Sequence, residues 1–386
     1  ALGGTATQPA QDLPTIRIYN SPAASFLTGP KTLQVGAAPL FTTIQEAIDA
    51  ASAGDTINVT SGTYILTETL RVNKDVTLVG IDHPLIQVSG TGYKISMTAA
   101  GATLQGFWIE STDKADQQAI IYVAASNLTI QDNKIWGTYV FGESQVSRAM
   151  VFTGGLSGLT IVNNEIYDLR QPGYISGVTT GTISNNFVYR TRGWVVEQGN
   201  MTFTGNTWGS GVDANVFDIA ILATGSPTYY TDVPALSEAN NNASIEDQRT
   251  SPATLSIVYV DASVTASGTG TQNSPKKTIT EGITRVVAGG TVYVAAGTYV
   301  EDLTIDKAMT LLGPNAEIDP NTGVRGDEAI LLPATSNPDP DVCSVMAYIS
   351  VSDVTVKGFT FNGDNPALTS GILINGVDVD ACEHIA

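Results

Sequence analysis

The chain has 386 residues, of which 14% are charged, and its 18 basic and 37 acidic residues give a formal net charge of −19. A protein this acidic repels phosphate backbones and anionic lipids, so we expect neither nucleic acid nor a membrane surface as a partner. No apolar run reaches the roughly 20 residues that a membrane-spanning helix needs, and the sequence predicts no transmembrane segment. Few cysteines and lysines, with abundant Thr, Ser, Gly and Asn, favour an exported bacterial protein, extracellular or at the cell surface.

A module of about 40 residues occurs twice, which is the signature of a repeat architecture. Residues 43–48 (TIQEAI) match residues 278–283 (TITEGI), and the similarity continues past Gly62 and Gly297. In each copy the apolar residues have helical spacing, and short β-rich runs punctuated by glycine follow. The sequence therefore predicts two solenoid units that begin in the same way.

The short helical segments, residues 43–52 and 278–287, have a structural explanation. A parallel solenoid leaves strand edges and core exposed at its open end, and an amphipathic helix laid over the first coil covers them. We predict that both segments are N-terminal capping helices.

A smaller repeat lies between the two modules. A β-rich triplet leads to an asparagine four times, at spacings of 31, 22 and 20 residues, and about 20–22 residues suffice for one coil of three short strands. Stacked coils place equivalent residues about 4.8 Å apart, so we predict a hydrogen-bonded ladder at turns that require left-handed φ. The predicted ladder consists of Asn133, Asn164, Asn186 and Asn206.

The ladder fixes which residues point outward. Three residues after successive ladder positions, Trp136, Tyr167 and Tyr189 form a predicted outer column, because side chains alternate between the two faces of a strand. Such a stripe suits a sugar chain, whose rings offer apolar faces. The alternatives are that the loop around residues 138–150 covers the rings, or that another subunit packs on them.

Charged residues flank this column. The same counting places Arg190 over Asp168 and Arg192 over Arg170. We predict that Arg170 contacts a glycan together with the three aromatic residues, because guanidinium groups form hydrogen bonds with hydroxyls and carboxylates. Asp168, Arg190 and Arg192 are candidate catalytic residues, although an exposed ion pair between rungs is the simplest explanation of the first two.

The rung pattern fades after residue 209, and four segments are predicted. Residues 1–34 form an N-terminal extension, 35–224 the first β-helix, 225–254 a linker rich in turn formers, and 255–386 a second β-helix that is incomplete at its C-terminus. We expect the natural protein to continue, or another subunit to stack on that end.

Two acidic turns in the second unit are candidate calcium sites, although neither completes a regular calcium-binding loop. The first contains Asp319, Asn321, Asp327 and Glu328, with Arg325 as a competing partner for its acidic residues; the second contains Asn337, Asp339 and Asp341. Calcium is the one cofactor that the sequence suggests. Cys343 and Cys382 either form a disulfide between neighbouring rungs or are both free.

The second copy carries VYVD at residues 258–261, GTGT at residues 268–271 and PKKT at residues 275–278. In these motifs the chain resembles the pectin-lyase-like β-helix superfamily, and within it bacterial cell-surface β-helix repeat proteins, over nearly all of residues 35–386. The resemblance implies an all-β, right-handed parallel β-helix. It does not define an activity, because members include lyases, hydrolases, epimerases, adhesins and structural repeats.

The catalytic signatures of that superfamily are missing. The two histidines, His83 and His384, do not stand in a Gly-His-Gly segment, and there is no Arg-x-Pro-x-x-Arg run. We therefore expect a structural or adhesive β-helix protein, such as a surface-layer component, adhesin or filament subunit, that contacts polysaccharide or other copies of itself. The alternative is a polysaccharide lyase or glycoside hydrolase acting on an acidic polysaccharide.

Overall fold

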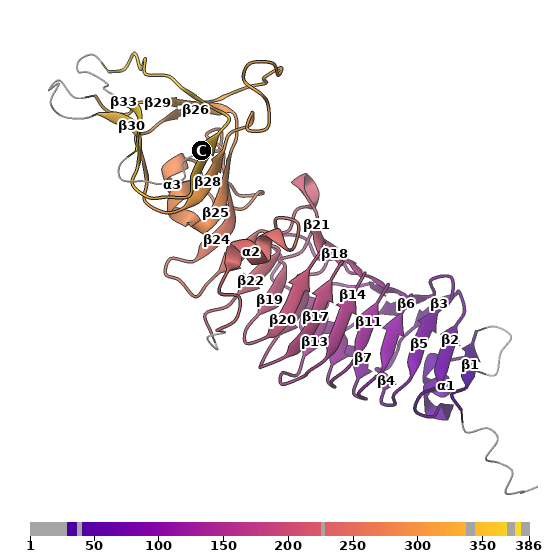
Figure 1. The fold of residues 1–386 in the computed structure, drawn as a ribbon. Helices are drawn as coiled ribbons and strands as arrows, with labels where there is room; N and C mark the ends of the chain where they lie inside the picture. Colours follow the sequence, from indigo (N-terminus) through magenta and orange to yellow (C-terminus); the bar gives the residue numbers. More distant parts are fainter. Residues whose placement is uncertain (1–28, 37–40, 225–227, 337–343, 369–374, 380–386) are drawn as a thin grey trace, which may run out of the picture.

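The computed structural model describes residues 29–36, 41–224, 228–336, 344–368 and 375–379 (Figure 1). The chain is an all-β protein, and the predicted right-handed parallel β-helix with two tandem units is confirmed. Most coils of the first unit contribute one strand to each of three sheets, and the paired strands of this unit are parallel. No helix in these described ranges is long and apolar enough to cross a membrane.

The first sheet of this unit has eight strands, and each pairs in parallel with the equivalent strands of the neighbouring coils. They are β1 (Thr32–Val35), β2 (Thr56–Val59), β5 (Thr77–Gly80), β8 (Thr103–Gln105), β11 (Thr129–Gln131), β14 (Leu159–Val162), β17 (Thr180–Ser184) and β20 (Asn200–Thr204).

The second sheet has seven strands and carries the predicted outer column. They are β3 (Thr63–Ile65), β6 (Leu85–Val88), β9 (Trp108–Ser111), β12 (Lys134–Trp136), β15 (Glu165–Tyr167), β18 (Phe187–Tyr189) and β21 (Thr207–Trp208).

The third sheet has twelve strands and runs through both units. Its strands from the first unit are β4 (Leu70–Val72), β7 (Gly92–Met97), β10 (Gln118–Val123), β13 (Ser147–Phe152), β16 (Gln171–Ile175), β19 (Trp194–Val196), β22 (Ile219–Ile221) and β23 (Ile245–Asp247). Its strands from the second unit are β24 (Thr254–Val260), β25 (Val286–Val294), β28 (Met309–Leu312) and β31 (Val354–Lys357).

Two three-stranded sheets complete the second unit. One contains β26 (Gly297–Val300), β29 (Ala329–Leu332) and β32 (Phe359–Phe361). The other contains β27 (Leu303–Ile305), β30 (Val345–Ile349) and β33 (Asn375–Val379).

The predicted caps are the helices α1 (Ile44–Ala50) and α3 (Ile279–Arg285). Each begins with a capping box, in which a threonine side chain accepts from the backbone of a glutamate whose carboxylate accepts from the threonine backbone: Thr43 with Glu46, and Thr278 with Glu281. The apolar residues of each helix are buried against the first coil of its unit. The repeated sequence therefore produces the same local structure twice.

The prediction that residues 225–254 form a linker is wrong in part. It contains the helix α2 (Val233–Glu238) and the strand β23, and the core of the first unit continues through Val233 and Ile245. Its turn formers have specific positions: Asp232 caps α2, and Asn240 accepts a hydrogen bond from the last ladder asparagine. The predicted extension also overlaps the fold, because β1 begins at Thr32.

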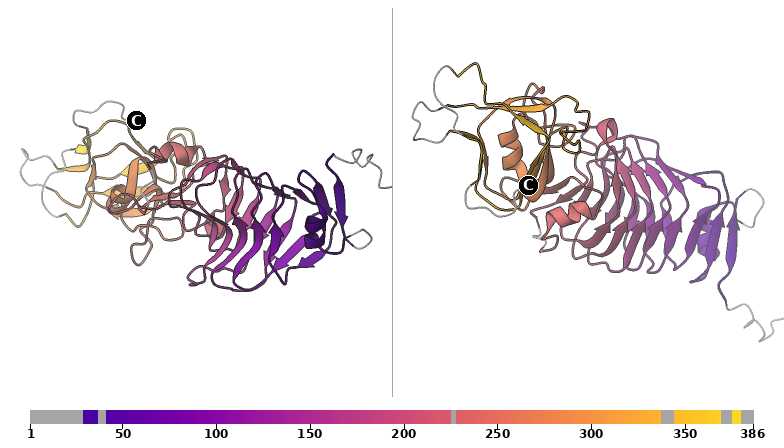
Figure 2. Two further views of the ribbon diagram at one scale, coloured as in Figure 1. Left: turned by 90° about the horizontal axis from the view of Figure 1, so that it is seen from below. Right: turned by 45° about the horizontal axis from the view of Figure 1, so that its top comes forward.

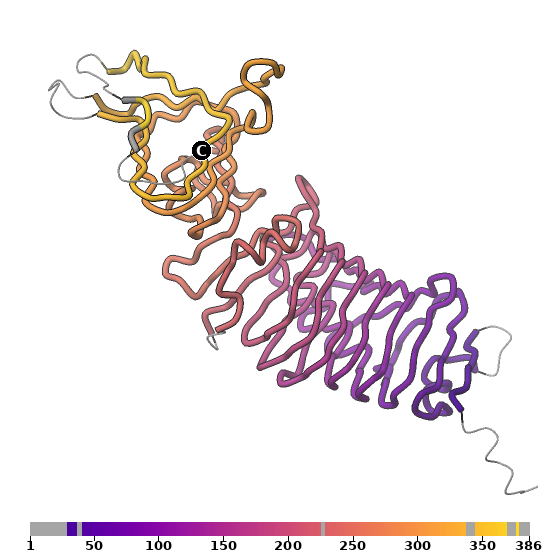
Figure 3. Tube along the Cα trace, in the orientation of Figure 1, coloured from indigo at the N-terminus to yellow at the C-terminus, as the bar shows by residue number. Residues whose placement is uncertain are grey.

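The two units meet through a reversal of chain direction. The strand β23 pairs in parallel with β22 but antiparallel with β24, whereas the other strand pairs of the five described sheets are parallel. Arg285 in α3 reaches back to Glu246 in β23 with a distance of 2.9 Å between Nη2 and Oε1. The units share this sheet but have separate hydrophobic cores. In Figure 3 the first unit is seen from the side and the second nearly end-on, so their axes do not coincide; Figure 2 gives two further views.

The four predicted asparagines form a continuous ladder inside the first unit, and each is at most 2% exposed. Their Nδ2 atoms donate from Asn133 to Asn164, from Asn164 to Asn186 and from Asn186 to Asn206, at 3.0–3.1 Å from the next Oδ1. Each Oδ1 also accepts from the backbone N–H of the preceding ladder residue, which for Asn133 is Phe107. The amides thus satisfy one another in an otherwise apolar interior.

The expected left-handed conformation belongs to a different residue. It occurs at the position immediately before each ladder asparagine, where Asp132, Asn163 and Asn185 have φ of 54–56° and Gly205 has φ of 66°. The strained turn therefore presents its left-handed residue outward and turns the following asparagine into the core. The prediction that the ladder residues themselves occupy this region is wrong.

Replacing Asn164 with alanine tests the ladder. The substitution leaves the buried N–H and Nδ2 donors of Asn133 without their acceptor, and unsatisfied buried groups cost about 1–3 kcal/mol each. We expect Asn164→Ala to lower the free energy of unfolding in urea by at least about 2 kcal/mol.

The neighbouring exposed residue provides the control. Asn163→Gly keeps a residue that tolerates positive φ, and we expect a change within about 0.5 kcal/mol. Equal destabilisation by the two substitutions would contradict a special role for the buried amide.

Candidate functional site

The outer face of the seven-stranded sheet carries a cluster of aromatic side chains. Trp136 lies directly opposite Tyr167, and Tyr167 opposite Tyr189, in adjacent parallel strands. The residues that directly precede these rings in the strands, among them Ile135 and Ile166, are fully buried. The register that the ladder predicts is thus the register of the structure.

The three rings stack on one another along the column. Trp136 and Tyr167 have centroids 6.0 Å apart and planes inclined by 5°, and Tyr167 and Tyr189 have centroids 4.6 Å apart and planes inclined by 6°. Because neighbouring rings cover each other's faces, the column presents mainly ring edges to solvent. The stack itself explains why these three residues are half-buried.

The polar atoms of this stack are engaged within the protein. Trp136 donates from Nε1 to Glu110 Oε1 at 3.3 Å, and the Tyr189 hydroxyl donates to Glu165 Oε1 at 2.7 Å. Lys134 pairs with the same Glu165 oxygen at 3.1 Å. Burial, followed by the hydrogen bond to Glu165, raises the pKa of Tyr189 well above its ordinary value.

The candidate catalytic pair is an ion pair between rungs. Arg190 Nε and Nη2 donate to the two carboxylate oxygens of Asp168 at 2.6 and 2.8 Å, and Nη1 donates to Asp213 at 2.7 Å. These partners raise the pKa of Arg190, with the Asp168 hydrogen bond as the largest cause. The guanidinium also lies 4.7 Å from the Tyr189 ring centroid, which makes Asp168 and Arg190 part of the support of the stack.

The other two arginines lie at the next corner of the coil. Arg192 donates its backbone N–H to the carbonyl of Arg170, as expected from the stacking of the two positions. The Arg170 side chain donates from Nη1 to the carbonyls of Ser144 and Gln145, at 3.0 and 3.4 Å. It fastens the loop around residues 138–150, so the structure does not place Arg170 beside the aromatic rings as a free glycan contact.

Sequence counting missed the more accessible aromatic residues. Trp108 and Phe187 are 43% and 42% exposed and share one outward column with Lys134 and Glu165. His83 stacks on Trp108 with centroids 5.7 Å apart. The same alternation of inner and outer residues would have predicted this column, which lies two residues before the first one along each strand. The rung of Trp108 was missed because it has Phe107 where later rungs have an asparagine. We call Trp108, Trp136, Tyr167, Phe187 and Tyr189 together the aromatic face.

The first candidate calcium turn is not assembled as a cation site. Glu328 is held by Arg325, with Nε–Oε1 and Nη2–Oε2 distances of 2.7 and 2.8 Å, and Asp319 accepts from the backbone of Asn321 and Thr322. In the described ranges no three acidic, histidine or cysteine side chains converge as metal ligands. The second turn, residues 337–343 with Cys343, and also Cys382, lie outside the described residues.

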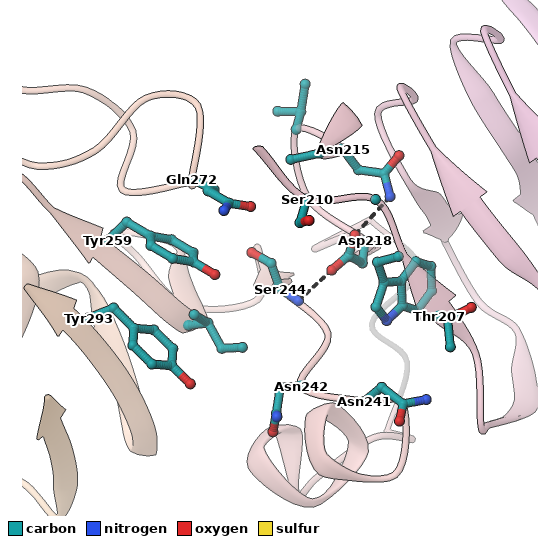
Figure 4. A pocket seen from close by; sticks show the side chains of 15 residues that line it. Thr207, Ser210, Asn215, Asp218, Asn241, Asn242, Ser244, Tyr259, Gln272 and Tyr293 are labelled. Atoms are coloured by element: carbon teal, nitrogen blue, oxygen red, sulfur yellow. Dashed lines mark hydrogen bonds between the residues drawn. The ribbon is translucent and has the colours of Figure 1, made fainter. Parts of the chain in front are cut away.

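A second candidate site lies where the two units meet, and no sequence pattern predicted it. A cleft of about 380 Å³ is bordered by β21 and the turn that follows it, by the segment after α2, and by β24 and β25 (Figure 4). Tyr259 and Tyr293 form one wall, and Asn241 and Asn242 belong to the opposite side.

Asp218 lies at the floor of this cleft and is 7% exposed. Its two carboxylate oxygens accept from Asn215 Nδ2 at 2.8 Å and from the backbone N–H of Ser244 at 2.7 Å. Burial raises the pKa of Asp218 to about 7, against the opposing effect of these two donors. The Ser244 hydroxyl beside it is buried without a hydrogen-bond partner in the described part of the chain. A buried carboxyl with a raised pKa in a concave site is a common feature of functional sites.

Comparison with known proteins identifies no family. No family model matches the chain, and no curated protein matches it. Among solved structures, a mutant of an alginate lyase of family PL6 is similar, with 12% sequence identity over 91% of this chain and 72% of that chain and a TM-score of 0.21. A likeness this distant has no bearing on activity, and the fold assignment stands on the parallel sheets of the chain itself.

The raised pKa of Asp218 predicts a pH-dependent contribution to stability. The folded state binds this proton more tightly than the unfolded state, so the contribution is complete below about pH 4 and is lost as the pH rises towards 7. We expect the unfolding free energy of the wild type, relative to Asp218→Asn, to fall across this range by roughly 1.4 kcal/mol per unit of pKa difference.

The measurement is urea unfolding of both proteins at several pH values between 4 and 8. Asparagine cannot ionise, so the stability of Asp218→Asn at each pH shows the contribution of all other titrating groups, and its difference from the wild type shows that of Asp218. Stability curves that run parallel over the whole range would show that Asp218 has an ordinary pKa.

Proposed function

We propose that this chain is an extracellular or cell-surface β-helix protein with a structural or adhesive role, and that it binds polysaccharide through the aromatic face. The composition, the two repeated modules and the missing catalytic signatures support the structural part of the proposal. The arrangement of exposed rings on one sheet supports the binding part.

The observation that carries the proposal is the exposure of Trp108 and Phe187 in the same outward column. Both rings lie on the regular sheet, and Trp108 is inclined by 76° to Trp136, so it does not stack into the column. Exposed aromatic rings suit the apolar faces of sugars. The neighbouring side chains that support these rings are held in place by ring stacking and ion pairs, which reduces the entropy lost on binding.

The charged groups of this face favour binding over catalysis. A general acid or base must reach the substrate and exchange a proton with it. Asp168 accepts two hydrogen bonds from Arg190, and Glu165 is shared by Lys134 and Tyr189. These carboxylates are committed to holding the rings in place.

Loss of the two exposed rings tests the proposal. Binding of the full chain to polygalacturonate, alginate and a neutral glucan would be measured by calorimetry, with release of unsaturated uronate ends followed in parallel. Stacking of a sugar on aromatic rings contributes on the order of 1 kcal/mol per ring, so Trp108→Ala with Phe187→Ala should weaken binding to the preferred polymer by about ten-fold or more.

The control is Tyr93→Ala, which removes an equally exposed ring from the third sheet and should leave binding unchanged. Tyr167→Ala with Tyr189→Ala should both weaken binding and destabilise the fold, because it removes the stack that supports the face. The proposal fails if the Trp108 and Phe187 variant binds as the wild type does. Release of unsaturated ends would establish a lyase instead.

A further inference from the structure

The cleft between the units contains an aromatic pair that the repeated module does not require. Tyr259 and Tyr293 lie side by side in β24 and β25, one position before the paired core residues Val260 and Val294. The first unit has the same arrangement in β1 and β2, with Val35 paired to Val59.

At the positions that correspond to the two tyrosines, the first unit has Gln34 and Asn58, which are also paired with each other. Both units fold the same strands, so the fold accepts polar residues there. The two aromatic residues therefore occur specifically where the second unit faces the first.

The tyrosine pair is available to a ligand. The two rings have centroids 5.5 Å apart and planes inclined by 21°, so each covers only one face of the other. Neither hydroxyl has a hydrogen-bond partner among the described residues, and Figure 4 shows both directed away from their strands into the cleft. Burial, with Tyr293 and Asp218 nearby, raises the pKa of Tyr259 to about 12, so this hydroxyl keeps its proton and can donate it to a hydrogen bond.

The opposite side of the cleft supplies amides and hydroxyls. Asn241 and Asn242, in the turn after α2, both have left-handed φ, at 53° and 58°, a conformation that asparagine tolerates better than most residues. Ser210 also lines the cleft, and Gln272 lines it from the side of Tyr259. Asp218 and the unpartnered Ser244 hydroxyl lie between the two sides.

The charge of the lining restricts the ligand. No lysine or arginine lines the cleft, and Asp218 is its one acidic residue. A site without a cation does not compensate the desolvation of an anionic ligand. The volume of about 380 Å³ lies within the range of small-molecule sites. Aromatic faces beside uncharged amides and hydroxyls are suited to a compact ligand with both apolar faces and hydroxyl groups.

We propose that the cleft binds a neutral saccharide of one or two sugar units, with Tyr259 and Tyr293 against a ring face and Asn242 and Gln272 bonded to hydroxyls. The site is separate from the aromatic face. No residue of the aromatic face lines the cleft, although Thr207, which does, is the strand partner of Phe187. Asp213, in the short 3-10 helix η2 (Gly211–Asp213), pairs with Arg190, which supports the aromatic face.

Ligand-observed saturation-transfer NMR on the full chain tests this site. The probes are methyl glycosides of glucose, galactose, mannose and xylose, with maltose and cellobiose, and glucosamine and glucuronate as charged matches. We expect at least one neutral probe to bind and both charged ones to bind more weakly. Exchanging the pair for the residues of the first unit, Tyr259→Gln with Tyr293→Asn, should weaken that binding by about ten-fold or more.

A matched control uses another stacked pair. Tyr93 and Tyr122, on β7 and β10, have centroids 3.9 Å apart, and Tyr93→Gln with Tyr122→Asn should leave binding unchanged. Asn242→Gly removes an amide from the opposite side but keeps a residue that tolerates the left-handed φ of this position. It should also weaken binding, which keeps the test valid if the tyrosine exchange perturbs the fold.

The expected results separate this site from the aromatic face: Trp108→Ala with Phe187→Ala should bind the neutral probe as the wild type does. The proposal is overturned if no neutral probe binds, if a charged probe binds best, or if binding survives both the tyrosine exchange and Asn242→Gly.

Discussion

Parallel stacking of successive coils in a fixed register is the constraint on which the other features of this protein depend. Within the first unit the buried asparagine ladder imposes it, because each amide can satisfy its neighbours only when the rungs are aligned. A shift of one residue would exchange the inner and outer faces of every strand. The same alignment that buries Ile135 and Ile166 therefore places Trp136 above Tyr167 on the outside.

Much of the fold could be predicted from the sequence because it depends on local repeats. The two threonine-capped helices and the alternation of inner and outer residues follow from patterns of fewer than ten residues. The asparagine positions follow from a short motif that recurs at spacings of 31, 22 and 20 residues. The pairing of Asp168 with Arg190 could be predicted by the same counting. Side-chain direction at the corners could not: Arg170 has the expected position, but its guanidinium is bound to loop carbonyls that are distant in sequence.

The joint between the units and the cleft beside it could not be predicted, since they depend on contacts without a repeat. The segment after residue 224 is rich in turn formers, which favours a linker, yet Ile245 continues the first core and β23 pairs with strands of both units. The two modules have the same capping helix, but the structure around that helix differs between the units. The first is long and bears the aromatic face, and the second brings Tyr259 and Tyr293 to the boundary.

The central claim, that adjacent coils are held in this register, is tested most directly by engineered disulfides on the outer face. Lys134 and Glu165 are direct partners in neighbouring parallel strands, about 4.8 Å apart, which is within the range for a disulfide. Lys134→Cys with Glu165→Cys should form a bond that peptide mass mapping detects, whereas Lys134→Cys with Tyr167→Cys, offset by two residues, should not. A bond in the offset pair, or none in the aligned pair, would contradict the account.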